Sequence, residues 1–191
     1  KNVTDEGVFN AYARILDTVA DDRLRVILYH IPQMSAVPIS HGLIERLLKT
    51  YPKTVVGIKD SAGDFANMQA MLKKFPGFSV LAGADPLMKP LLEAGGQGCI
   101  TATSNLVGQQ LATVFANFKN ASKVAEVESA QARIVAVRNI SNSFVQIPAI
   151  KALIAHRYGD DAWANVQPPL VKLSSEQRGE IATAMNGLSA A

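Results

Sequence analysis

Cysteine and histidine are scarce in this sequence. Cys99 is the single cysteine among 191 residues, which excludes an internal disulfide framework and fits a reducing compartment. The three histidines, His30, His41 and His156, are dispersed and show no spacing typical of metal ligands. We therefore expect neither a disulfide scaffold nor a metal site.

Long hydrophobic runs and runs of like charge are also missing. No apolar stretch approaches the roughly 20 residues that a membrane-spanning helix needs, and the opening segment Lys1–Asp5 lacks the layout of a signal peptide. The net charge of +3 comes from scattered lysines and arginines, with no basic run and no interleaved aromatic residues. These absences favour a soluble, cytoplasmic protein without a nucleic-acid or membrane partner.

What the sequence does contain is enough apolar material for a sizeable core. Hydrophobic residues make up 48% of the chain and charged residues 18%, a balance that excludes a disordered protein. The chain opens on Lys1 instead of methionine and enters a helical pattern almost at once. We interpret this abrupt start as a sign that an upstream portion is missing.

Extended and helical patterns alternate along the first 120 residues. Apolar residues spaced three and four apart predict an amphipathic helix over residues 4–20. Short apolar runs predict buried strands over residues 24–29, 54–59, 78–82 and 98–101. Each strand is followed by a predicted helix, over residues 40–48, 63–72, 86–95 and 106–118. Apolar strands joined by helices indicate a parallel sheet covered on both faces, and either an open doubly wound sheet or part of a (β/α)8 barrel fits.

The rest of the chain shows helical patterns without a clear strand. We predict helices over residues 122–142, 148–158 and 174–188, with residues 166–169, which include two prolines, as a rigid connector. The predicted organisation is therefore an α/β part over residues 1–120 and a helical extension over residues 121–191.

Lys59 closes the second predicted strand, and Tyr29 closes the first. An amine at the carboxyl end of a buried strand can lose its charge and attack a carbonyl carbon, as Schiff-base lysines do. In a parallel sheet both strand ends open on one cleft, where a phenol can relay protons. Asp60 need not meet the amine, because successive strand side chains point to opposite faces. An ordinary surface lysine and an ordinary strand-end tyrosine remain the alternatives at this point.

Small and polar residues follow the third and fourth strands at the same carboxyl end of the predicted sheet. Gly83 permits a ligand to approach the backbone closely, and Asp85 and Ile100 stand beside the same predicted cleft. We take these three residues as candidate substrate contacts, with simple turn chemistry as the alternative. Gly95–Gly98 lacks the dinucleotide-binding fingerprint and predicts only a helix end.

Two motifs then carry a family resemblance. Tyr29-His30-Ile31-Pro32, followed by Gly57-Ile58-Lys59-Asp60, resembles the paired signature of the dihydrodipicolinate synthase and N-acetylneuraminate lyase superfamily. The likeness extends through residues 83–85 and 98–101 and covers most of the chain. It implies the C-terminal half of a (β/α)8 barrel followed by a helical extension. The first half of the barrel, with its Thr-Thr-Gly stretch that binds the pyruvate carboxylate, would then lie upstream.

The resemblance also implies an activity and its parts. Lys59 would be the Schiff-base lysine and Tyr29 the proton-relay tyrosine of a pyruvate-dependent lyase or synthase, which forms or cleaves a carbon–carbon bond beside a 2-oxo acid. No metal or organic cofactor is implied, and the implied assembly is a homo-oligomer, often a tetramer. The alternatives are a sugar-acid dehydratase that uses the same imine and a non-catalytic 2-oxo-acid binding protein.

One departure from the family pattern bears on the substrate. Dihydrodipicolinate synthases usually carry an arginine shortly after the Tyr-x-x-Pro segment, where it holds a substrate carboxylate, and Met34 stands in that place here. A thioether cannot make charge-assisted hydrogen bonds to a carboxylate. The local pattern is closer to the lyases and sugar-acid aldolases.

Overall fold

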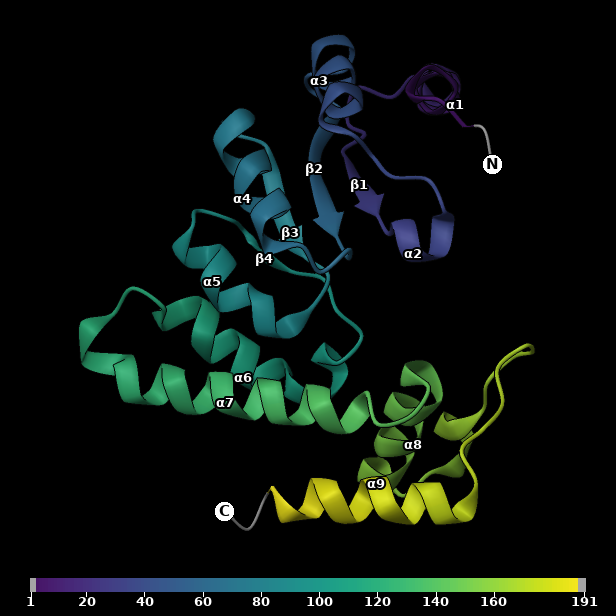
Figure 1. Ribbon diagram of the computed structural model, residues 1–191, viewed down its shortest axis with the longest axis vertical. Helices are drawn as coiled ribbons and strands as arrows, with labels where there is room; N and C mark the ends of the chain where they lie inside the picture. Colours follow the sequence, from purple (N-terminus) through teal and green to yellow (C-terminus); the bar gives the residue numbers. More distant parts are fainter. Residues whose placement is uncertain (1–2, 189–191) are drawn as a thin grey trace. The chain divides into compact units, whose positions relative to one another are not determined.

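The first part of the protein contains a four-stranded parallel sheet. The computed structural model describes residues 3–188, which divide into two compact units between Ile100 and Thr101. In the first unit the strands lie side by side in chain order (Figure 1). They are β1 (Val26–His30), β2 (Val55–Asp60), β3 (Ser79–Ala82) and β4 (Gly98–Cys99). Four strands were predicted, and four are found, although the predicted strand over residues 98–101 keeps only two residues.

Helices connect these strands as the sequence predicts. They are α1 (Asp5–Val19), α2 (Pro32–Ser35), α3 (His41–Thr50), α4 (Phe65–Lys74) and α5 (Met88–Glu93), with a 3-10 turn η1 (Asp85–Leu87) before α5. The helices α1, α3 and α4 are capped by the side chains of Thr4, Ser40 and Asp64, which accept hydrogen bonds from backbone N–H groups in the first turn. The single turn α2 was not predicted, because proline after β1 indicates only the end of a strand.

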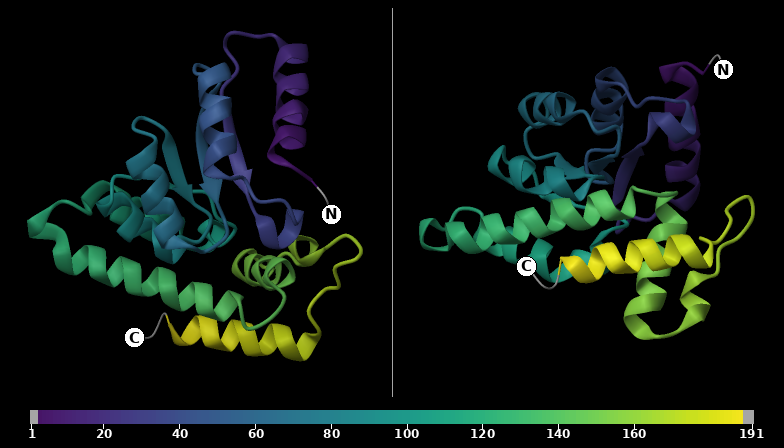
Figure 2. Two further views of the ribbon diagram at one scale, coloured as in Figure 1. Left: turned by 45° about the horizontal axis from the view of Figure 1, so that its top comes forward. Right: turned by 60° about the horizontal axis from the view of Figure 1, so that its bottom comes forward.

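The helices cover one face of the sheet. Leu28, Ile58 and Val80 are buried on that face, in one core cluster with residues of α3 and α4, and both helices run along the same side of the strands (Figures 1 and 2). The other face bears Ile27 and Tyr29, which are exposed. The expectation of helices on both faces is therefore wrong for this unit. Of the two architectures left open by the sequence, a sheet with helices on one face fits the barrel.

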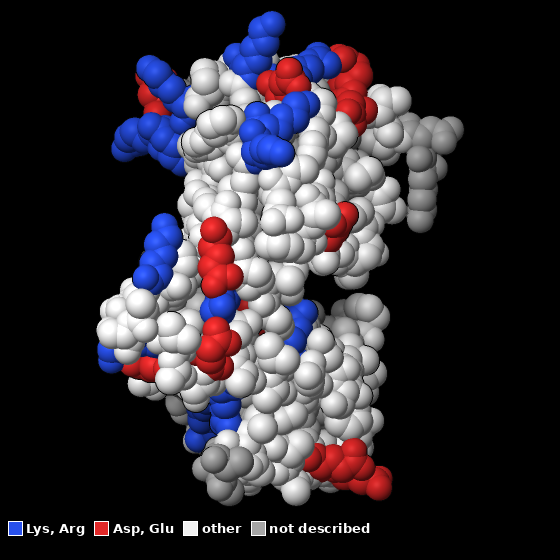
Figure 3. Space-filling model, turned by 60° about the vertical axis from the view of Figure 1, so that its left-hand side comes forward, with Lys and Arg blue, Asp and Glu red and all other residues white. Residues whose placement is uncertain are grey.

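The end of the sheet that lies opposite the strand carboxyl ends is rich in positive charge. Lys49 stands in the last turn of α3, and Lys73 and Lys74 stand in the last turn of α4. Lysines and arginines gather where these helices end, at the top of the view in Figure 3. Cations there complement the partial negative charge of the helix carboxyl ends, so we assign these charges to helix stability.

The second unit contains helices and loops but no strand in its described residues, 101–188. Its helices are α6 (Ser104–Asn117), α7 (Val124–Ser141), α8 (Gln146–Tyr158) and α9 (Ser175–Gly187), with 3-10 turns η2 (Ala121–Lys123) and η3 (Asp161–Ala164). The predicted helices after residue 120 are confirmed, and Ser174 and Gln177 form a capping box at the start of α9. In residues 3–188 no helix is long and apolar enough to cross a membrane. The division at residue 120 stays a prediction.

Candidate active site

Tyr29 and Lys59 are brought together by the register of the sheet. β1 and β2 pair in parallel, with Tyr29 opposite Lys59 and His30 opposite Asp60. The Lys59 amine nitrogen Nζ lies over the Tyr29 ring, 4.0 Å from its centroid, a geometry typical of a cation–π contact. Tyr29 remains 46% exposed. The pair therefore presents an amine and a phenol together at the carboxyl end of the sheet.

Asp60 faces away from this pair. It is fully buried, and its carboxylate accepts hydrogen bonds from the Ala62 backbone N–H (2.8 Å) and from Asn67 Nδ2 (2.9 Å). Asn67 Oδ1 in turn lies 2.9 Å from His41 Nε2. The alternation of strand side chains thus separates Asp60 from the Lys59 amine, as the sequence indicated. The carboxylate instead fixes the turn that follows β2.

The electrostatic surroundings of Tyr29 favour its ionised form. Burial raises the pKa of the Tyr29 phenol, but the Lys59 amine and the Ser61 hydroxyl act in the opposite direction and leave this pKa below its ordinary value. A phenol with a lowered pKa gives up its proton more readily near neutral pH. This is the property that a proton relay requires.

Ser61 belongs to the same constellation, and sequence reasoning missed it. Apart from its interaction with Tyr29, its buried Oγ has no hydrogen-bond partner among residues 3–188. The Ser61 backbone N–H donates to the His30 carbonyl at 2.8 Å, which continues the sheet beyond β2. The signal was present in the sequence, because Ser61 stands two positions after Lys59 and strand residues two apart share a face.

The three predicted substrate contacts lie at different depths. The Gly83 backbone N–H donates to the Asp60 carbonyl at 2.7 Å, and the Ile100 N–H donates to the Ala82 carbonyl at 2.9 Å. The Ile100 side chain is exposed, whereas Asp85 is fully buried at the start of η1. A ligand can therefore reach the exposed Ile100 side chain from solvent, whereas the buried Asp85 side chain is not accessible from solvent. The substrate-binding role of all three residues stays a prediction.

A side chain at position 83 would collide with Ser61. A Cβ on Gly83 would lie 2.0 Å from Ser61 Oγ and 2.7 Å from Ser61 Cα. We expect Gly83→Ala to lower the free energy of unfolding by roughly 1–3 kcal/mol, as overpacking of a tight site does. Urea denaturation of the full-length protein measures this change.

Gly179→Ala provides the matched control for that substitution. Gly179 lies inside α9, where an added Cβ would meet nothing within 4 Å, so the change should raise the unfolding free energy by roughly 0.5–1 kcal/mol. Unchanged stability of Gly83→Ala together with weaker substrate binding would instead favour the direct ligand contact predicted from the sequence.

Met34 is placed where it can influence a substrate. It lies in the single turn α2, directly after β1, and is 79% exposed. Such exposure leaves the thioether without a packing role in the described core. Met34, which stands where the family pattern has arginine, thus lies on the surface near the carboxyl end of β1.

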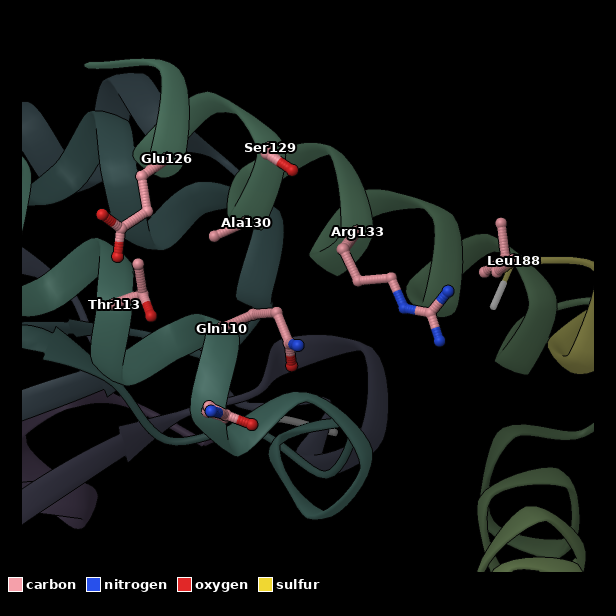
Figure 4. A pocket seen from close by; sticks show the side chains of 8 residues that line it. Gln110, Thr113, Glu126, Ser129, Ala130, Arg133 and Leu188 are labelled. Atoms are coloured by element: carbon pink, nitrogen blue, oxygen red, sulfur yellow. The ribbon is translucent and has the colours of Figure 1, made fainter. Parts of the chain in front are cut away.

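The second unit contains a separate polar pocket. It has a volume of about 490 Å³, and Figure 4 shows side chains from α6 and α7 around it. Its lining residues are Gln109, Gln110, Thr113, Glu126, Ser129, Ala130, Arg133 and Leu188. None of them is a predicted site residue. Among residues 3–188 no group of three or more His, Cys, Asp or Glu side chains could hold a metal ion.

Comparison with known proteins identifies the family to which this chain is similar. The model of a family described as the dihydrodipicolinate synthetase family matches residues 2–188. A protein described as an uncharacterized DapA-like lyase, from Chloroflexus aurantiacus, is 35% identical over 173 residues, which are 91% of this chain and 56% of that protein. The 4-hydroxy-tetrahydrodipicolinate synthase of Listeria welshimeri is 30% identical over 181 residues, which are 93% of this chain and 59% of that enzyme.

A solved structure supports the same relationship. The crystal structure of dihydrodipicolinate synthase from Agrobacterium tumefaciens superposes with a TM-score of 0.81 at 28% identity, over 98% of this chain and 62% of that one. The predicted fold class, part of a (β/α)8 barrel followed by a helical extension, is confirmed. The chain spans less than two thirds of the length of these relatives.

Proposed function

This chain belongs to the dihydrodipicolinate synthetase family, and on that premise we propose that the protein is a Schiff-base lyase or synthase acting on a 2-oxo acid. The observation that carries the proposal is the pairing of Lys59 with Tyr29, whose ring centroid lies 4.0 Å from Nζ. An amine nucleophile and a proton relay on neighbouring strands are the two groups that imine chemistry requires. The reaction is the forming or breaking of a carbon–carbon bond beside the 2-oxo group.

In the first half of the proposed reaction Lys59 becomes bonded to the substrate. Its neutral amine attacks the 2-oxo carbon of pyruvate, and a proton passes from the nitrogen to the former carbonyl oxygen to give a carbinolamine. Protonation of that hydroxyl by the Tyr29 phenol lets it leave as water, with an iminium ion left on Lys59. The positively charged nitrogen then acts as an electron sink for the adjacent carbon.

In the second half the carbon–carbon bond is made. Loss of a proton from the methyl carbon gives an enamine, which attacks the carbonyl carbon of an aldehyde, and the resulting alkoxide takes a proton relayed through Tyr29. Water then hydrolyses the imine and releases the product from Lys59. Cleavage runs through the same steps in reverse, with pyruvate as the released fragment.

The second substrate in this proposal is an aldehyde that needs no arginine at position 34. Met34 is exposed after β1 and offers no charge to a carboxylate. This favours a sugar-like aldehyde, whose hydroxyl groups are neutral, over an electrophile held by its own carboxylate. The homo-oligomeric assembly implied by the family resemblance remains a prediction.

Borohydride reduction in the presence of pyruvate tests the proposal. We expect the full-length protein to gain one stable adduct per chain, on Lys59, because borohydride converts the imine to a secondary amine that survives peptide mapping by mass spectrometry. Omission of either pyruvate or borohydride is the control. Pyruvate that binds without leaving an adduct would favour a non-catalytic binding protein, and an adduct on another lysine would overturn the assignment of Lys59.

A panel of aldehydes and sugar acids then separates the remaining alternatives. Consumption of pyruvate with an aldehyde identifies a synthase or lyase, whereas loss of water from a sugar acid without carbon–carbon cleavage identifies the dehydratase. Both outcomes share the Lys59 imine, so the trapping result alone does not distinguish them.

A further inference from the structure

The turn after Lys59 is held by hydrogen bonds from several directions. The Ser61 N–H donates to the His30 carbonyl, and the Ala62 N–H donates to the buried Asp60 carboxylate. The Ser61 carbonyl is the remaining backbone polar group of this residue, and it accepts a hydrogen bond of 2.7 Å from Gln33 Nε2. Both backbone polar groups of Ser61 are thus satisfied, one by β1 and one by the side chain of α2.

Gln33 makes this contact from a turn that is closed on itself. In α2 the Ser35 hydroxyl lies 3.0 Å from the Ile31 carbonyl and 2.9 Å from the Val37 carbonyl. Ala36 ends the turn with a left-handed backbone conformation, at a φ of 55°. The side chain of Gln33 therefore links a compact turn after β1 to the turn after β2, across 28 positions of sequence.

The position of Ser61 matters because Ser61 stands two positions after Lys59, which pairs with Tyr29 across the sheet, so all three lie on one face. Gly83 packs against the Ser61 side chain so closely that a Cβ would be 2.0 Å from Oγ. Gly83 therefore limits the movement of the Ser61 hydroxyl, and this hydroxyl lowers the pKa of the Tyr29 phenol. The charge that acts on the phenol is that of Lys59, whereas His30 and Asp60 lie on the opposite face in hydrogen bonds of their own.

From these contacts we propose that Gln33 is a positioning residue that holds the Ser61 hydroxyl against Tyr29. The role of Tyr29 as a proton relay rests on the proposed function, but the positioning itself does not require turnover. Gln33 reaches neither the amine nor the phenol, and it acts through the Ser61 carbonyl. Ser61 in turn favours the ionised form of the Tyr29 phenol, the form that can accept a proton in a relay.

Gln33→Met tests this proposal, because methionine keeps the length of the side chain and removes the donor. In the free protein we expect the pKa of Tyr29 to rise toward that of an ordinary tyrosine, since a looser Ser61 hydroxyl stabilises the phenolate less. Ultraviolet titration of tyrosinate, with the Tyr29→Phe spectrum subtracted, measures this change. In turnover kcat should fall about tenfold with a smaller change in KM, as misplacement of a catalytic group does.

Two further variants make the result decisive. Gln69→Met carries the same substitution on the exposed side of α4 and should leave the Tyr29 titration unchanged. In a Ser61→Ala background, Gln33→Met should have no additional effect on that titration, because both changes remove the same interaction. An equal shift in the presence and absence of the Ser61 hydroxyl, or no shift at all, would overturn the proposal.

The titration also separates this inference from the proposed function. It is measured without substrate, so a shift in Gln33→Met would stand even if borohydride trapped no adduct. Conversely, an adduct on Lys59 together with an unchanged Tyr29 titration would support the imine chemistry and reject the role of Gln33.

Discussion

Lys59→Met is expected to abolish turnover and the borohydride-trapped adduct together. Methionine keeps an unbranched apolar stem against the Tyr29 ring but has no nitrogen to attack a carbonyl carbon. The loss in kcat should be on the order of 10⁴-fold or more, since removal of a covalent nucleophile costs at least that in enzymes where it has been measured. Steady-state kinetics on the full-length protein, with mass spectrometry after borohydride treatment, measure both effects.

The variant should fold normally. The substitution removes one cation–π interaction at a partly buried position, and such an interaction stabilises a protein by roughly 0.5–1 kcal/mol. Lys53→Met is the matched control, because Lys53 is exposed in the turn before β2 and lies at the other end of that strand from Lys59. Activity retained by a well-folded Lys59→Met protein would reject Lys59 as the nucleophile.

The sheet and its helices followed well from sequence patterns. The strands coincide with apolar runs, and Thr4, Ser40 and Asp64 begin helices because their side-chain oxygens satisfy free backbone N–H groups. Whether helices would cover one face or both could not be predicted. A strand in a barrel interior and a strand between two helix layers are both buried on two sides, so each appears as the same continuous apolar run.

The pairing of Tyr29 with Lys59 was also predictable, because it depends on regular geometry. Tyr29 and Lys59 each stand near the carboxyl end of a strand, and neighbouring parallel strands bring such positions into register. The sequence indicated both the pairing and the absence of Asp60 from it. The roles of Gly83, Asp85 and Ile100 were harder to predict, since residues after a strand follow the path of each loop.

The polar contacts around the pair could not be predicted from spacing. Gln33 meets Ser61 from a single helical turn that begins at Pro32, and a proline after a strand predicts only where the strand ends. The sequence indicated only that His41 is no metal ligand, and it gave no sign of the contact that His41 makes with Asn67 between α3 and α4. Contacts of this kind depend on where elements pack, and periodicity along the chain does not record that.

Tyr29→Phe is expected to slow the reaction while leaving imine formation possible. Phenylalanine keeps the ring over which the Lys59 amine lies and removes only the hydroxyl, which is the proposed proton relay. The loss in kcat should be roughly 10²–10⁴-fold, which is the usual contribution of a positioned acid or base. Borohydride should still trap pyruvate on Lys59, but more slowly than in the wild-type protein.

The pH dependence of this variant gives a second measurement. Because the pKa of Tyr29 lies below its ordinary value, the wild-type dependence of kcat/KM on pH should contain a limb below the range of an unperturbed tyrosine. That limb should disappear in Tyr29→Phe, because the group that titrates is gone.

Tyr158→Phe is the matched control, since Tyr158 is an exposed tyrosine at the end of α8 and is no predicted site residue. It should keep both the wild-type rate and the limb.

Persistence of the limb in Tyr29→Phe would assign it to another group. A wild-type rate in that variant would reduce Tyr29 to a support for the Lys59 side chain, and the proton relay would then have to come from elsewhere in the full-length protein.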